Sequence, residues 1–372
     1  MKKILFYLVI SLLPAYALGQ VVCPVPDMGQ VAILFSADGA SSIGEAEFSL
    51  AADTKVRFAT GNLQYCPYQD KWRIAARPYD IVGGKLSSDE PKGTHGTVWE
   101  MINGKLTRCT NDYSHQQAYQ GWIDVFPWGA SGWYGDDGTE SRDPNVSSDD
   151  RKANNPLGKV TCHPFEYNKQ GGNYNLGGNK KQGMNGDWAK ADWGVRNNTE
   201  LGGSASIKFR TPTMQEFYYI FNSRTNARRL RGRARIRLIC EADRSKDTLI
   251  NGIIVLPDNW YAEPKILPPG KTFKSDAEAR YYWDNEYTED EWKYYFDAQG
   301  AIFLPAAGGI GNGASVKVNR SGFYWVSDPG TDGNCYDLEF GGYNTTENYE
   351  PALTKATRWW CRAVRLVVEI TE

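Results

Sequence analysis

The last fifth of the 372-residue sequence, from Gly300 to Val368, constrains the fold most. Short apolar or alternating runs recur there at 300–308, 321–328, 335–340 and 361–368, and Gly, Asn, Asp and Pro bound them. Such runs predict β-strands. The segments between them are polar and carry Trp, Tyr, Asn and Asp. This arrangement is typical of strands that form a scaffold and loops that bind a ligand.

Alternation within these runs predicts which side chains enter the core. Successive side chains of a strand point to opposite faces, so every second residue shares a face. The residues expected inside are Tyr336, Leu338, Phe340, Val364, Leu366 and Val368. Asp337 and Glu339 should point to the other face.

The first nineteen residues have the pattern of a secretory signal peptide. Lys2 and Lys3 precede the apolar run 4–13, and small residues follow up to Gly19. This pattern predicts export with cleavage before Gln20, and a secreted or cell-surface location. Lipidation at Cys23 is the less favoured alternative, because no small residue stands directly before it as a lipobox requires. Residues 20–46 are expected to form a leader or linker.

Composition limits the function classes. The net charge of −2 gives no reason to expect a nucleic-acid partner. No run after the signal peptide is long and apolar enough to span a membrane. Three His are too few for a usual His-built metal site, and we expect neither a metal nor a cofactor. Seven Cys in an exported chain suggest disulfides with one cysteine left over.

Residues 47–372 are expected to form one domain with a polar insertion around 134–187, a segment too rich in Gly and Asn to bury a core of its own. The Trp-rich and Gly-rich stretch from Gly121 to Trp133 is interpreted as an aromatic corner of the core rather than an exposed stacking platform. Within the insertion, Asp136-Asp137-Gly138 lacks the spaced oxygen ligands of a calcium loop. It is interpreted as a solvated turn.

Two helix starts stand out. Thr213 with Glu216, and Thr288 with Glu291, have the spacing of a capping box. The second helix should end at Gly300, with Trp292, Tyr295 and Phe296 on one face. Two main helices among many short antiparallel strands define an α+β fold with long loop insertions.

A run of alternating arginines occupies positions 229, 231, 233, 235 and 237. Period two places all five on one face of a strand. We favour a solvated edge strand whose charges prevent aggregation and form local ion pairs. The alternative is a groove for an acidic glycan or another polyanion.

Several stretches resemble known families. The segment F-R-T-P-T-M-Q-E-F, Phe209 to Phe217, resembles a helix start of formylglycine-generating-enzyme-type proteins. The segments G-F-Y-W from Gly322 and A-V-R-L-V from Ala363 resemble later landmarks of that group and of the bacterial major-paralogous (FISUMP) domain. The opening from Phe48, with L-Q-Y at 63–65, resembles secreted bacterial members. The resemblance covers roughly Phe48 to Val368 and implies a C-type-lectin-like fold.

The resemblance also carries residue-level implications. Cys335 and Cys361 resemble the inner disulfide of C-type lectins, so we expect them to be paired. Their separation of 26 residues departs from the closely spaced catalytic cysteines of formylglycine-generating enzymes, and that activity is not carried over. Glu350-Pro351-Ala352 lacks the amide of the lectin Glu-Pro-Asn motif, and Trp-Asn-Asp is absent. Calcium-dependent sugar binding is therefore not expected.

No nucleophile elbow, metalloprotease helix or phosphate loop occurs, and we expect no catalytic residue. The favoured function is ligand binding, to a glycan or a surface protein, by the loops that follow the C-terminal strands. The residues expected to bind are Asp328, Asp332, Asn334, Tyr343, Asn344, Asn348, Tyr349 and Trp359. One alternative is an enzyme on the formylglycine-generating scaffold or a glycosidase. Another is a structural or adhesin subunit.

Overall fold

The computed structural model describes residues 43–44, 46–51, 54–81, 97–102, 105–110, 121–133, 183–239, 244, 247–262, 265–311, 314–330, 334–358 and 360–370. These residues belong to one compact unit, 41–372. The predicted signal peptide, Cys23, the 136–138 turn, most of the 134–187 insertion, Asp332 and Trp359 lie outside the described residues.

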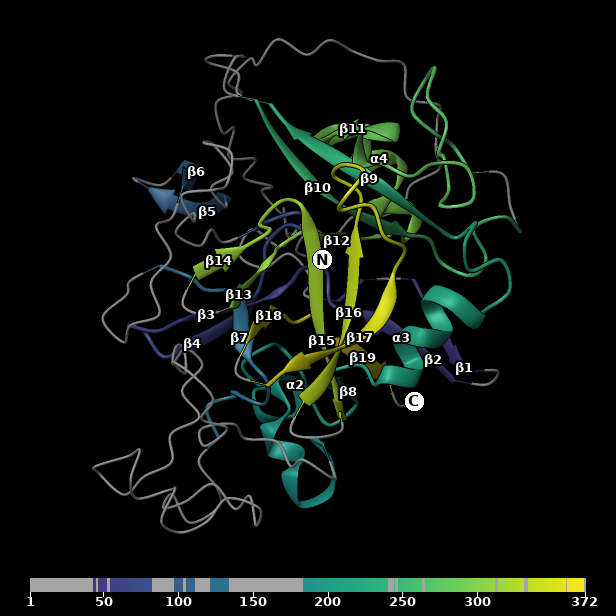
Figure 1. The fold of residues 1–372 in the computed structure, drawn as a ribbon. Helices are drawn as coiled ribbons and strands as arrows, with labels where there is room; N and C mark the ends of the chain where they lie inside the picture. The colour runs from purple at the N-terminus through teal and green to yellow at the C-terminus, as the bar shows by residue number, and fades with distance from the viewer. Residues whose placement is uncertain are drawn as a thin grey trace, which may run out of the picture. The chain divides into compact units, whose positions relative to one another are not determined.

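The described residues form a mixed α+β fold that consists mostly of strands (Figure 1). The largest sheet has seven strands. Along it lie β14 (Ala314–Val316), β13 (Gly309–Gly311), β18 (Cys361–Ala363), β15 (Ser321–Pro329), β16 (Asn334–Gly341) and β17 (Ala352–Thr357), and β7 (Val125–Pro127) also pairs with β18. Its long strands β15 and β16 run side by side as an antiparallel pair.

Two four-stranded sheets and two hairpins complete the strands. One sheet contains, in spatial order, β11 (Glu286–Thr288), β9 (Arg231–Leu238), β10 (Thr248–Val255) and β12 (Ile302–Pro305). The other contains β1 (Phe48–Ala51), β2 (Thr54–Phe58), β19 (Val367–Ile370) and β8 (Ile207–Arg210). The hairpins are β3 (Leu63–Cys66) with β4 (Lys71–Ile74), and β5 (Thr97–Ile102) with β6 (Lys105–Thr110).

The helices are short. The α-helices described are α2 (Trp193–Arg196), α3 (Met214–Tyr218) and α4 (Glu289–Tyr295). Short 3-10 or π-helical segments are η1 (Gly186–Ala191), η2 (Tyr219–Ser223), η4 (Tyr282–Asp284) and η5 (Asp297–Gln299).

Both predicted capping boxes are confirmed. Thr213 and Glu216 cap α3, and Thr288 and Glu291 cap α4, with each side chain bonded to the other residue's backbone N–H. Gly300 ends the second helical segment in the left-handed conformation, with φ of 83°. A Cβ there would be strained, which explains why the sequence has glycine at this position.

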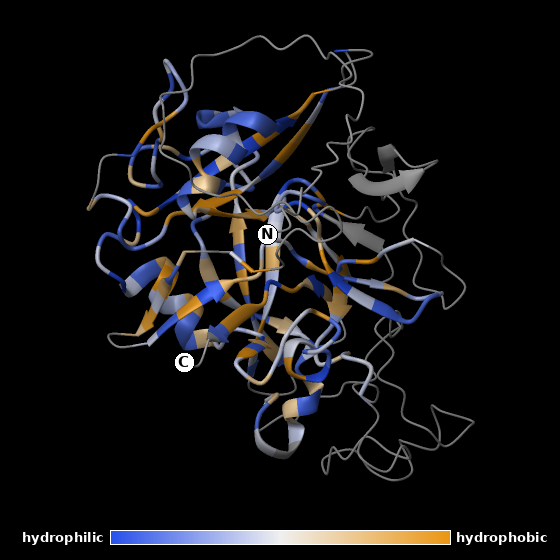
Figure 2. Ribbon diagram, turned by 180° about the vertical axis from the view of Figure 1, so that it is seen from behind, coloured by the Kyte–Doolittle hydropathy of each residue, from blue (hydrophilic) through white to orange (hydrophobic). Residues whose placement is uncertain are grey.

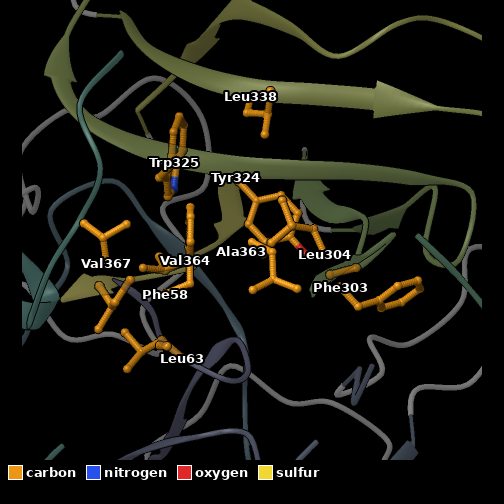
Figure 3. Close-up of a cluster of buried hydrophobic side chains, with 14 of the residues drawn as sticks. Phe58, Leu63, Phe303, Leu304, Tyr324, Trp325, Leu338, Ala363, Val364 and Val367 are labelled. Carbon is orange, nitrogen blue, oxygen red and sulfur yellow. The ribbon is translucent and has the colours of Figure 1, made fainter. Parts of the chain in front are cut away.

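One core joins the sheets. Apolar residues concentrate on the strands, and polar residues dominate the outer helices and loops (Figure 2). Figure 3 shows buried apolar side chains from β2, β3, β12, β15, β16, β18 and β19 in one cluster. The predicted core residues Leu338, Phe340, Val364, Leu366 and Val368 are fully buried, and Tyr336 is half-buried. The Gly121–Trp133 stretch also lies inside, with Trp128 and Trp133 buried.

The run 361–368, predicted as a single strand, is interrupted. β18 and β19 belong to different sheets, and residues 364–366 connect them. At this crossing Arg365 is completely buried, although it carries a charge.

Arg365 donates hydrogen bonds to oxygens of four residues, which come from three separate segments of the chain. Its Nε donates to Asn62 Oδ1 at 3.1 Å, and its Nη1 donates to the carbonyl of Ala59 at 3.0 Å. Its Nη2 donates to the carbonyls of Pro78 and Phe303 at 3.3 and 2.8 Å. Burial lowers the pKa of Arg365 to about 10, because a charged group loses its hydration there.

The arginine run does not form a solvated edge strand, so that prediction is wrong. β9 lies inside its sheet, between β11 and β10. Arg231 and Arg233 are buried against Asp276, whereas Arg235 and Arg237 form ion pairs with Glu286 near the surface. The expected local ion pairs therefore exist, but two of the five arginines, Arg231 and Arg233, lie in the interior.

The disulfide expected between Cys335 and Cys361 is absent, and both thiols are free and buried. Cys335 lies on β16 and Cys361 on β18, with β15 between them. Strands lie about 4.8 Å apart, so two strands separated by a third are about 10 Å apart, beyond the Cα separation of about 7 Å that a disulfide allows. Burial raises the pKa of both thiols.

Arg365→Lys should destabilise the protein by about 3 kcal/mol or more, because an ammonium group cannot reproduce the fork that reaches four buried acceptors. Denaturant unfolding monitored by Trp fluorescence measures the change. The control is Arg196→Lys on the exposed side of α2, expected to change stability by less than about 0.5 kcal/mol. Equal effects of the two variants would contradict a central role for Arg365.

Alkylation mapping should find Cys335 and Cys361 unmodified in the native protein and fully modified after denaturation without any reductant. Burial blocks the reagent in the native state, and no bond between the two thiols blocks it after unfolding. A peptide pair linked through these residues, detected by mass spectrometry of unreduced protein, would disprove the free-thiol assignment.

Candidate functional site

Those predicted binding residues that the structure describes lie toward the two ends of the β15–β16 hairpin. β15 ends at one end of the hairpin, where Pro329 faces Cys335. The loop after β16 lies at the other end, where Gly341 faces Ser321. At about 3.3 Å per residue, the two ends of β16 are roughly 23 Å apart.

At the first end, the predicted residues hold the backbone together. The Asp328 carboxylate accepts a hydrogen bond from the backbone N–H of Met214, the first residue of α3, and thereby ties β15 to this helix. Burial raises the pKa of Asp328. Asn334 begins β16, and its carbonyl accepts from the N–H of Gly330 at 2.9 Å. Asp332 and Trp359 are not among the described residues.

At the other end, the predicted residues shape the loop 342–350. The Asn344 side-chain oxygen accepts from the N–H groups of Thr346 and Glu347 at 2.9 and 3.0 Å. Tyr343 lies under the Arg320 guanidinium, 5.1 Å from ring centre to Cζ. Asn344 therefore fixes this loop, and its replacement is expected to disturb the loop as well as any bound ligand.

Asn348 is half-buried, as is Tyr349. The Tyr349 hydroxyl donates to Ser321 Oγ at 2.7 Å, and its carbonyl accepts from Arg233. Its ring lies against Gly341, where a Cβ would approach the ring to 2.8 Å. Tyr349 therefore braces the loop against the sheet. It also reaches the face of the seven-stranded sheet on which Glu339 lies.

That face is the best candidate site. We call it the sheet-face cluster. Its members come from neighbouring strands of the seven-stranded sheet and from the segments beside them, and they combine charged with aromatic side chains. The sheet-face cluster consists of Lys317, Phe323, Asp337, Glu339, Tyr349, Thr354, Trp360 and Arg362.

Strand register explains how these residues meet. Phe323 of β15 faces Glu339 of β16, and Asp337 of β16 faces Thr354 of β17. Positions 337 and 339 lie two apart, so their side chains share a face. On β18, Arg362 lies next to Ala363, which pairs with Tyr324. The cluster thus extends across four adjacent strands.

Arg362 is held rigidly at the base of the cluster. Its Nε donates to Asp337 Oδ2 at 3.0 Å, and its Cζ lies 4.2 Å from the Phe323 ring centre and 4.7 Å from the Trp360 ring centre. Its Nη1 lies beside Gly309, where an added Cβ would come within 2.5 Å. A larger residue at position 309 would displace the guanidinium, so the glycine is needed for this close approach.

The rim of the cluster is more open. Thr354 Oγ1 lies 2.6 Å from Asp337 Oδ1 and 3.2 Å from Glu339 Oε2, so it bridges the two carboxylates. Lys317 Nζ lies 5.5 Å from the Tyr349 ring centre. Lys317, Glu339, Tyr349 and Thr354 are all half-buried, so each is partly accessible.

Burial dominates the electrostatics at the base. Asp337 is only 1% exposed, and burial raises its pKa although Arg362 acts in the opposite direction. Burial likewise lowers the pKa of Arg362, which Asp337 opposes. With Lys317 and Glu339, the cluster holds two cations and two carboxylates. It therefore suits an uncharged ligand rich in hydroxyl groups better than an ion.

Sequence reasoning missed most of this cluster. The alternation in 336–340 correctly sends Asp337 and Glu339 to the face opposite Leu338 and Phe340. The sequence signal that could have indicated the cluster is the pair of carboxylates on the non-core face of one strand. No sequence pattern indicates that Arg362 and Thr354 join them, because their proximity depends on the order of strands within the sheet.

A second unusual carboxyl lies away from the cluster. Burial raises the pKa of Asp80 to about 7, and Arg77 only partly offsets this effect. Its Oδ1 has no hydrogen-bond partner, and its Oδ2 accepts from the Arg77 N–H at 3.2 Å. The adjacent Tyr79 hydroxyl donates to Glu289 at 3.2 Å. Carboxyl groups with strongly shifted pKa values are common at functional sites. Asp80, however, is 3% exposed and cannot contact a ligand from solvent.

Asp80 should make stability depend on pH. Its folded pKa of about 7 exceeds the ordinary 3.8, so the folded state binds the proton more tightly. This contribution to stability is fully present below about pH 4 and is lost as the pH rises through about 7. Asp80→Asn should flatten this decline in unfolding free energy, measured by urea titration at several pH values. Exposed Asp290→Asn is the control, and an unchanged slope in Asp80→Asn would refute the assignment.

No family model, curated protein or solved structure matches the chain. In the part that the structure describes, no helix is long and apolar enough to cross a bilayer. Nor do three or more His, Cys, Asp or Glu side chains of these residues come together as a metal site.

Proposed function

We propose that the protein is an exported or cell-surface ligand-binding protein on a C-type-lectin-like scaffold, and that the sheet-face cluster binds a glycan. The signal-peptide pattern of residues 1–19 supports export. The mixed α+β architecture and the capped helix at Thr213 are consistent with the scaffold that the sequence resembles.

The observation that carries the proposal is the combination of neutralised charges and aromatic faces on one sheet surface. Glu339 and Thr354 offer hydrogen-bonding groups to sugar hydroxyls, and Lys317 offers a donor. Tyr349 and Trp360 offer flat apolar surface to a sugar ring. These groups are fixed by their neighbours before a ligand arrives, which lowers the entropic cost of binding.

A catalytic function is less well supported. Glycosidases use two carboxyl groups that flank the bond they cleave, and Asp337 with Glu339 are the nearest pair here. Asp337, however, is buried and bonded to Arg362 and Thr354, so it lacks access to a substrate. Its geometry suits the positioning of Arg362.

The test is a glycan array followed by calorimetric titration with the neutral oligosaccharide that wild-type protein retains. Glu339→Gln should weaken binding roughly 10- to 100-fold, because a hydrogen bond to a charged group contributes about 1.5–3 kcal/mol. Glu47→Gln changes an exposed carboxylate elsewhere and should leave the affinity unchanged. Absence of any retained glycan would contradict glycan binding. Undiminished binding by Glu339→Gln would exclude the sheet-face cluster as its site.

A further inference from the structure

A second charged cluster surrounds the start of β9. Arg231 and Arg233 both bond to Asp276, at 2.8 Å each, and the three side chains are at most 2% exposed. One buried carboxylate therefore faces two guanidinium groups. Arginine stays protonated in proteins, so this buried group carries an excess of positive charge.

The two arginines differ in how their remaining donors are used. Arg233 donates to the carbonyls of Gly341 and Tyr349 at 2.6 and 2.8 Å, so its role in holding the loop is clear. Arg231 is 1% exposed, yet its Nη1 has no hydrogen-bond partner. A buried donor without a partner is uncommon and suggests a missing acceptor.

The buried Arg231 guanidinium lies close to the exposed carboxylate of Glu350. Its Nη2 lies 3.6 Å from Glu350 Oε2, and Arg228 Nη2 lies 2.7 Å from Glu350 Oε1. Arg228 and Glu350 are 56% and 55% exposed, so both can move away. The exposed Glu350 carboxylate thus contacts two cations, one of which is buried.

We propose that Arg228 and Arg231 bind an oxyanion of an acidic glycan, such as a sulfate group, and that Glu350 occupies this place when no ligand is bound. An arginine fork matches the oxygens of sulfate or carboxylate. A ligand oxyanion that replaces Glu350 keeps the contact with Arg228 and brings an acceptor close to the Arg231 guanidinium. The excess positive charge of the buried group favours an anion over a neutral ligand.

An exposed aromatic ring contacts Arg229, the residue that follows Arg228. Arg229, next in the chain to Arg228, lies 5.1 Å from the Tyr261 ring centre, and the Tyr261 hydroxyl donates to the Arg229 carbonyl at 2.9 Å. Tyr261 is 51% exposed. A cation next to an exposed ring provides contacts for the sugar that carries the oxyanion.

The proposal is independent of the sheet-face cluster, whose charges balance and whose proposed ligand is neutral. The test is titration of the protein with inorganic sulfate, glucose 6-sulfate and glucose at a constant ionic strength set with chloride, followed by thermal shift and calorimetry. We expect saturable binding of sulfate, tighter binding of glucose 6-sulfate, and no response to glucose at this site.

Two variants test the assignment without touching a buried residue. Glu350→Gln should strengthen sulfate binding by about tenfold, because the competing carboxylate is gone, and Arg228→Gln should weaken it by about tenfold. Arg244→Gln is the matched control, since Arg244 is also exposed and paired with a carboxylate, Asp247. It should leave sulfate binding unchanged.

Three results would contradict the proposed oxyanion site. No saturable sulfate binding in either wild-type protein or Glu350→Gln would refute the site. Equal weakening by Arg228→Gln and Arg244→Gln would show non-specific attraction instead. Glucose 6-sulfate that binds no tighter than inorganic sulfate would refute the acidic-glycan assignment. None of these outcomes alters neutral-glycan binding or its dependence on Glu339.

Discussion

The buried guanidinium of Arg365 is the constraint on which the rest of the structure depends. It lies where the chain leaves the seven-stranded sheet and enters the sheet of β2 and β19. Its fork reaches oxygens of Ala59 and Asn62, which are neighbours in the sequence, and of Phe303, which is remote from both. Asn62 continues the network to the Tyr324 hydroxyl, which donates to Pro305. Because each partner is buried, all must be in place together.

Buried arginines with fixed hydrogen-bond acceptors also occur elsewhere in the molecule. Arg362 with Asp337, and Arg231 and Arg233 with Asp276, are buried charges held by opposite charges and by carbonyls. Such groups cost desolvation energy that apolar residues would not, so they contribute more to a defined geometry than to net stability. Where they approach the surface they leave fixed polar groups beside aromatic rings. Both proposed binding sites have this origin.

Local signals predicted local structure well. The capping boxes at Thr213 and Thr288, the stop at Gly300 and the alternation from Tyr336 to Phe340 depend on neighbours within a few residues, and the structure has each of them. Long-range expectations were less successful. The arginine run forms an interior strand, and the described residues expected to share a ligand lie toward opposite ends of a hairpin. Strand neighbours and loop positions depend on contacts that periodicity does not encode.

The sequence by itself determined the α+β class, the helix starts and the division of Asp337 and Leu338 between two faces of a strand, because these follow from side-chain period and capping chemistry. Only the tertiary structure decided that Cys335 and Cys361 stay apart, because β15 separates their strands. Only it placed Arg362 beside Asp337 and Arg231 near Glu350. Those pairs join strands and loops remote in the sequence, and the order of strands in each sheet fixes which of them meet.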